Sequence, residues 1–277
     1  MLCFKMALTS RERVLMALKH KEADRIPIHD SPWDTTVDRW RSEGLPSGVS
    51  PADYFGYELA GFSADTTPQL PVEVIREDEE YIVERDSYGG VRRNHRDRST
   101  TPEIIDYPCK TRADWEKLKP RLQPSDWRVD WVSTFNNYHY QRSLGRFITY
   151  NAAVGYDKIQ NYVATVRLLK AVIMEPDWVV DMYWADAKLA MEMCDRMMRA
   201  GLKFDGAFLF CDLGYKNGLL FSPKHYEQQL HPVFKELCRF FHSRDMPVLL
   251  HSCGRVKDLI PLFIEEGIDC LQPIEVQ

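Results

Sequence analysis

Short apolar segments alternate with helix-like segments in the C-terminal half of the chain. The apolar runs are RFITYNAAVG, DGAFLFCD, MPVLLHS and DCLQPIEV. Strands that alternate with helices in this way pair in parallel, and the helices form the crossovers. The runs are apolar throughout, which is typical of strands that are buried on both faces. The sequence therefore predicts an α/β protein built on a parallel sheet.

Start and stop signals delimit the intervening helices, which we predict over residues 157–174, 176–200, 222–243 and 256–266. Pro176 falls in the first turn of the second helix, and Gly201 follows its end. Ser222 followed by Pro223 is typical of an N-cap and a first helical residue. These signals predict two helices between the first two of these strands and one helix in each later interval.

The N-terminal half carries fewer such signals. Thr9 and Glu12 have the spacing of a capping box, so a helix is predicted from Thr9 to Lys21. The run RIPIHDS that follows is predicted to be a short strand. The alternating segment YIVERDSYGGVRRN, with two adjacent glycines, predicts a β-hairpin. A further short helix is expected over residues 111–118.

Two architectures fit strands and helices that alternate, a (β/α)8 barrel and an open doubly wound sheet. The chain contains neither GxGxxG nor GxxxxGK[ST], so the common nucleotide-binding forms of the open sheet lose support. We therefore expect a TIM barrel. The chain has 277 residues, 44% of them hydrophobic, and this suits one large domain over residues 1–277.

Charge and cysteine usage narrow the class of protein. A formal net charge of −5 argues against a surface built for nucleic acid or for an anionic membrane. No apolar run approaches the ~18 residues of a membrane span. The seven cysteines form no CxxC pair, which is typical of reduced thiols in an intracellular, cytoplasmic protein.

Residues with ionisable or metal-binding side chains end the last three predicted strands: Asp212, His251 with Cys253, and Glu275. The carboxyl ends of parallel strands meet at one rim, where the sites of such folds lie. His251 and Cys253 are two positions apart on extended backbone, so their side chains point to the same side. Nitrogen and sulfur ligands suit zinc.

A zinc site needs at least a third protein ligand. Glu275 and Asp212 lie at the correct rim, whereas Cys270 begins its strand and is expected at the opposite one. A ligand beyond residue 277 is the remaining alternative. The loop CDLGYKNGLLFSP carries Tyr215 between glycines, which favours a pocket wall, although an ordinary connection fits equally well. Asp65 is either catalytic or a turn former.

These segments resemble the uroporphyrinogen decarboxylase superfamily, and within it the zinc methyltransferases that work with corrinoid proteins. The resemblance runs from TSRERVLMALKHKEADRIPI through YIVERDSYGG and CDLGYKNGLLFSP to PVLLHSCGRVKDLIPLFIEEGIDCLQP. It implies a (β/α)8 barrel. It also implies a zinc site at His251 and Cys253, because the family holds zinc through an H-x-C segment and a distant cysteine. That cysteine has no counterpart here, so we expect a C-terminally incomplete barrel that lacks its last strand and helix.

The resemblance implies that a methyl group moves between a small-molecule donor or thiol and a corrinoid held on a partner protein. Asp212 or Glu275 would be the third ligand or would orient the imidazole, and Tyr215 would wall the pocket.

Two alternatives remain. A cofactor-independent decarboxylase of porphyrin biosynthesis would use Asp65, although the arginines of its first-strand segment are missing here. A non-catalytic barrel fragment would bind without turnover. An incomplete barrel also leaves an open edge, which predicts a partner or a homo-oligomer.

Overall fold

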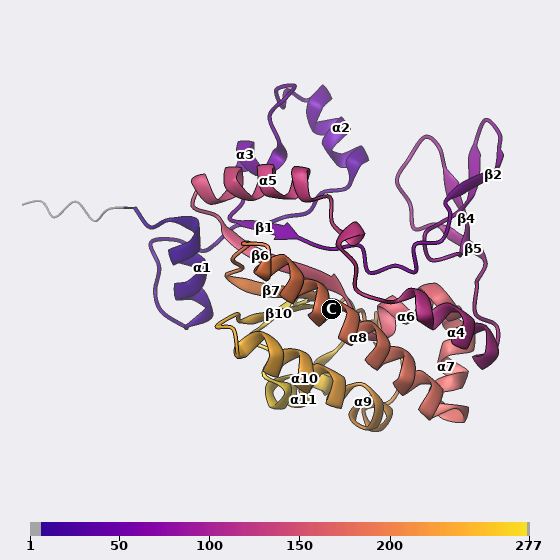
Figure 1. Ribbon diagram of the computed structural model, residues 1–277. Helices are drawn as coiled ribbons and strands as arrows, with labels where there is room; N and C mark the ends of the chain where they lie inside the picture. Colours follow the sequence, from indigo (N-terminus) through magenta and orange to yellow (C-terminus); the bar gives the residue numbers. More distant parts are fainter. Residues whose placement is uncertain (1–6, 276–277) are drawn as a thin grey trace, which may run out of the picture.

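The computed structural model describes residues 7–275, and a five-stranded parallel sheet lies at the centre of the fold (Figure 1). In sheet order the strands are β1 (Leu59–Phe62), β6 (Phe147–Ala153), β7 (Gly206–Phe210), β10 (Val248–His251) and β11 (Cys270–Gln272). Each strand pairs with the next one along the chain, whereas the order of a doubly wound sheet reverses. The prediction of an α/β protein with a parallel sheet is confirmed.

Helices precede β1 and separate the later strands. They are α1 (Ser10–Leu18), α2 (Asp34–Ser42), α3 (Pro51–Phe55), α4 (Arg112–Leu118), α5 (Trp131–Ser143), α6 (Gly155–Val163), α7 (Thr165–Met174), α8 (Pro176–Arg199), α9 (Pro223–Gln229), α10 (His231–His242) and α11 (Ile260–Glu266). In Figure 1, α5 lies above the sheet, α10 and α11 lie below it, and α1 lies at the left.

The two faces of the sheet pack differently. Alternate residues of the strands, such as Tyr150 of β6, point into the main core formed with the crossover helices. The Tyr150 hydroxyl donates to the Ala190 carbonyl of α8 at 2.8 Å, and its ring packs against Phe241 of α10. On the opposite face, α1 covers the amino ends of the strands, where Val14 packs against Phe147. On that face the carboxyl ends of β10 and β11 carry the polar side chains of His251 and Gln272, whereas β7 ends with Phe210.

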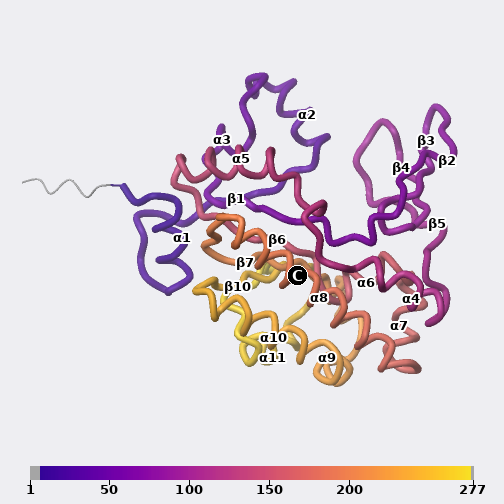
Figure 2. Tube along the Cα trace, in the orientation of Figure 1, coloured from indigo at the N-terminus to yellow at the C-terminus, as the bar shows by residue number. Residues whose placement is uncertain are grey.

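A second, antiparallel sheet branches from the connection between β1 and α4 (Figure 2). Its strands are β2 (Glu73–Glu77), β3 (Tyr81–Arg85), β4 (Val91–His95) and β5 (Glu103–Asp106). The pairing of β3 with β4 confirms the predicted hairpin. Strand β2 is exposed along its whole length.

The prediction of a strand in RIPIHDS is wrong. This segment pairs with no strand, and the Ile26 side chain is 84% exposed. The Ile28 amide donates instead to the Glu58 carboxylate at 2.6 Å, and the Ile28 carbonyl accepts from the Glu58 amide at 2.8 Å. Glu58 also forms an ion pair with Arg13 of α1. The carboxylate and the backbone amide of one residue, Glu58, therefore take the bonds that a neighbouring strand would have supplied.

Two predicted helices are each divided in the structure. The first breaks at Ala164, whose positive φ of 73° separates α6 from α7. The second breaks between α9 and α10, where Pro232 lies in the first turn of α10 and has no amide to continue the preceding helix. The last predicted helix begins with a 3₁₀ turn, Lys257–Leu259, ahead of α11.

Closure into an eight-stranded barrel is not seen in residues 7–275, where β1 and β11 form the two edges of the parallel sheet. The barrel therefore stays a prediction. Within this range no helix combines the length and the apolarity that crossing a membrane requires.

Candidate metal centre

Asp212, His251 and Cys253 each direct one ligand atom to the same place, and these atoms lie within 4.8 Å of one another. The Cys253 sulfur is 3.3 Å from His251 Nε2, and Asp212 Oδ1 is 3.6 Å from the same nitrogen. The predicted convergence of strand ends thus brings together an oxygen, a nitrogen and a sulfur atom.

The backbone of two neighbouring strands sets this geometry. His251 ends β10 opposite Phe210 of β7, and the Cys211 amide donates to the His251 carbonyl at 2.9 Å. Beyond the strands, the Cys253 amide donates to Asp212 Oδ1 at 2.8 Å. Ser252, between the two candidate ligands, is fully buried and its hydroxyl accepts from the Leu213 amide at 3.1 Å. These hydrogen bonds therefore hold the segments after β7 and β10 together.

A third strand orients the imidazole. His251 Nδ1 lies 2.5 Å from Gln272 Oε1, and Gln272 ends β11 in register with His251. An amide oxygen only accepts, so Nδ1 carries the proton and Nε2 keeps its lone pair. That lone pair faces Cys253 and Asp212. Metal-binding histidines are commonly oriented in this way by a hydrogen bond at the other ring nitrogen.

The charge around Cys253 is negative. Burial, followed by the charges of Asp212 and Glu275, raises the pKa of the Cys253 thiol to about 11. The thiol is therefore protonated at neutral pH in the absence of a cation. A divalent cation would reverse this balance, because a coordinating thiol loses its proton.

The donor set fits zinc better than a hard cation. Magnesium and calcium take oxygen ligands, whereas zinc accepts thiolate, imidazole and carboxylate together. Three protein ligands with a fourth position open is the arrangement of catalytic zinc sites. Asp212, His251 and Cys253 supply three such ligands without any residue from outside the described chain.

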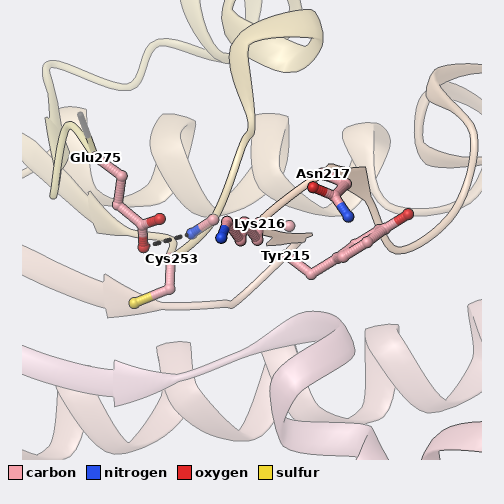
Figure 3. A pocket seen from close by; sticks show the side chains of 7 residues that line it. Tyr215, Lys216, Asn217, Cys253 and Glu275 are labelled. Carbon is pink, nitrogen blue, oxygen red and sulfur yellow. Dashed lines mark hydrogen bonds between the residues drawn. The ribbon is translucent and has the colours of Figure 1, made fainter. Parts of the chain in front are cut away.

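Glu275 lies beside this group but outside it. Its Oε1 accepts from the Gly254 amide at 2.8 Å, which holds the segment after β11 against the His-x-Cys turn (Figure 3). Glu275 and Cys253 line a cavity of about 610 Å³. That Glu275 is a metal ligand stays a prediction.

Tyr215 walls the same cavity. It lies on a two-residue strand, β8 (Gly214–Tyr215), that pairs with β9 (Gly218–Leu219) in a small hairpin after β7. The side chain is 50% exposed, and Figure 3 shows it at the far end of the row of labelled residues from Cys253. The loop therefore shapes the pocket, whereas a catalytic role for Tyr215 stays a prediction.

Asp65 follows β1 at the same rim, apart from the cluster. Its carboxylate oxygens accept from the Thr67 amide at 2.8 Å and from the Gln69 side chain at 3.0 Å. These contacts are those of a turn former, and a catalytic role stays a prediction. Cys270 packs at the opposite end of the sheet near Leu249, as predicted.

Two residues at the site were not found from the sequence. Gln272 was passed over because the last strand was expected to continue to Glu275, whereas β11 ends before Pro273. Asp157 lies in the first turn of α6, after β6, and burial together with the nearby Asp212 raises its pKa. Its position just after a strand end was the available signal.

Comparison with known proteins bears on the fold. No protein-family model and no curated protein sequence matches the chain. The structure is similar to that of a methyltransferase from Methanosarcina mazei, with a TM-score of 0.63 and 15% sequence identity. The match covers 95% of this chain and 75% of that one. At this identity the likeness shows a shared α/β fold and carries no statement about activity.

Proposed function

We propose that this protein is a zinc-dependent methyltransferase that moves a methyl group between a small-molecule donor or thiol and a corrinoid carried by a partner protein. The observation that carries the proposal is the convergence of Asp212, His251 and Cys253 at the carboxyl ends of β7 and β10. The fold shared with a methyltransferase supports it. The parallel sheet with consecutive strand order also supports a (β/α)8 barrel of the uroporphyrinogen decarboxylase type.

Each residue of the cluster has a distinct part. His251 would bind through Nε2, because Gln272 holds the proton on Nδ1. Cys253 would bind as the thiolate and Asp212 through a carboxylate oxygen. The Cys253 amide already fixes the Asp212 carboxylate, so this ligand is oriented in advance. Zinc held there would act as a Lewis acid that favours the deprotonated form of a substrate thiol or polarises the oxygen of a methyl donor.

The surrounding residues would shape access. Tyr215 and Glu275 line the 610 Å³ cavity that opens beside Cys253, and this cavity is large enough for a small substrate. Tyr215 is half-exposed at the wall of this cavity, and a corrinoid on a partner protein would approach from this side.

Metal analysis tests the proposal. Protein purified without chelator is expected to hold close to one zinc per chain, measured by mass spectrometry. Cys253→Ala and His251→Ala should lower the content to a small fraction, because a site of two ligands binds zinc weakly. Cys270→Ala is the matched control, since this thiol lies on the neighbouring strand at the opposite end of the sheet.

Retention of full zinc by Cys253→Ala would exclude the assigned site, and absence of zinc from the wild type would exclude the metal. Activity is then followed by the absorbance change as methylcobalamin loses its methyl group to 2-mercaptoethanol. The zinc-loaded wild type should accelerate this loss and Cys253→Ala should not.

A further inference from the structure

A separate cavity of about 270 Å³ lies at the carboxyl ends of β1 and β6. It is lined by Asp65, Thr66, Tyr88, Asn151, Lys158 and Phe210, among others. Tyr88 lies in the turn between β3 and β4, and Lys158 lies on α6. The proposed metal chemistry uses none of the polar groups of this cavity.

Lys158 is a buried cation with neutral partners. The residue is only 2% exposed. Its Nζ donates to Thr66 Oγ1 at 2.7 Å and to the Tyr88 hydroxyl at 3.2 Å. The ammonium also lies 4.8 Å from the centre of the Tyr88 ring. An ammonium has three donors, and the described residues supply acceptors for two of them. Buried lysines are rarely left without an anion.

The nearby carboxylates do not fill this role. Across residues 7–275, no carboxylate oxygen comes within the 4.0 Å of an ion pair with Nζ. Asp65 is bonded within its own loop. Burial raises the pKa values of Asp157 and Asp186, and the positive charge of Lys158 opposes the rise in each. Neither carboxylate forms an ion pair with Nζ. One position for an anion at Nζ is therefore left open.

A second donor, the Asn151 side-chain amide, lines the same cavity. Asn151 lies on the face of β6 opposite the main core, and its Oδ1 accepts from the Thr149 hydroxyl at 2.7 Å. Its Nδ2 group lies over Gly61 of β1, where a Cβ atom would come within 2.1 Å of that nitrogen. Glycine at this position makes room for the amide, which lines the cavity with its hydrogen atoms available to an acceptor.

We propose that this cavity binds an oxyanion, a carboxylate or phosphoryl group, of a small organic substrate through Lys158 and Asn151. The Phe210 ring separates the cavity from the candidate metal centre, with its centroid 5.6 Å from that of His251. The substrate would therefore extend past Phe210, with its anionic end at Lys158 and its reacting end at the metal. The placement of the reacting end at the metal rests on the proposed function, whereas anion binding by the cavity does not.

The test compares benzoate with benzamide, its neutral isostere, and with inorganic phosphate, by calorimetric titration of both metal-free and zinc-loaded protein. Benzoate or phosphate is expected to bind at least about tenfold more tightly than benzamide, because a charge-assisted hydrogen bond in a buried site favours the ion. The stronger of the two identifies the group as carboxyl or phosphoryl. Lys158→Met should abolish the difference, and Lys188→Met, an exposed lysine of α8, should retain it.

Asn151→Asp is a second variant that leaves the lysine in place and should weaken anion binding by placing a negative charge in the cavity. Circular dichroism confirms folding of each variant. The proposal would be overturned if neither benzoate nor phosphate bound more tightly than benzamide, or if the affinity for the preferred anion were unchanged in Lys158→Met. Anion binding by protein that holds no zinc would support the anion site while the proposed metal function fails.

Discussion

The backbones at Gly214 and Gly254 approach each other more closely than a side chain permits. A Cβ atom on Gly254 would lie 2.4 Å from the Gly214 carbonyl carbon, and Gly254 has a φ of +82° that other residues rarely adopt. This contact joins the Tyr215 hairpin to the turn that carries Cys253. The glycine after the His-x-Cys pair is therefore part of the site's construction.

Gly254→Ala is expected to destabilise the fold by about 2 kcal/mol or more, since it combines backbone strain with a steric overlap. Urea unfolding monitored by circular dichroism measures the change. Gly218→Ala is the matched control in the same hairpin, because a Cβ atom there meets nothing within 4 Å. Equal stability of the two variants would contradict the close approach.

Helix α8 carries a buried carboxyl group in its middle. Asp186 is fully buried, and neither of its carboxylate oxygens has a hydrogen-bond partner among the described residues. Burial raises the pKa of Asp186 to about 7, and the charge of Lys158 opposes the rise. In the unfolded chain the same group loses its proton near pH 4. Between these values only the folded state keeps the proton.

The stability that Asp186 contributes is therefore complete below about pH 4 and is lost as the pH rises through about 7. Asp186→Asn removes this dependence, so its stability relative to the wild type should increase between about pH 4 and pH 7, by roughly 4 kcal/mol at most. Urea unfolding across this range provides the measurement. Asp177→Asn, an exposed carboxylate of the same helix, controls for loss of a charge. Parallel pH profiles for wild type and Asp186→Asn would refute the shift.

Elements with local signals could be predicted from the sequence. The Thr9 and Glu12 side chains form the expected capping box at the start of α1, and Pro176 opens α8 as predicted. The breaks at Ala164 and before Pro232 were missed for different reasons. A positive φ at an alanine is imposed by tertiary packing, whereas the proline was a local signal that the apolar periodicity outweighed.

The residues of the site also divide into those with a local sequence signal and those set by tertiary packing. The spacing of two positions predicted that the His251 and Cys253 side chains point to the same side of their strand. The position of Asp212 at the end of the preceding predicted strand predicted that it lies beside them. Gln272 and Lys158 depend on strand register and on packing between distant segments, which no local pattern encodes. Sequence reasoning thus found the three candidate ligands and missed Gln272, which orients His251, and Lys158, which lines the separate cavity.

The main core spans the parallel sheet and the crossover helices, while the antiparallel sheet packs little against it. Hydrogen exchange should therefore be slowest in β6 and β7, which have a paired neighbour on both sides, and fast in the exposed edge strand β2. Mass spectrometry of exchanged peptides should show protection that differs on the order of a thousandfold. Strong protection of β2 would mean that another chain covers it, which light scattering would then reveal as an oligomer.

The hydrogen bond from His251 to Gln272 links the candidate metal centre to the edge strand β11, which has one paired neighbour in the described chain. Edge strands fray more readily than central ones. If fraying withdraws Gln272, the imidazole loses its fixed tautomer and the affinity for the cation falls. By thermodynamic linkage a bound cation must suppress fraying of β11 by the same free energy. Binding of the cation and pairing of β11 would then stabilise each other.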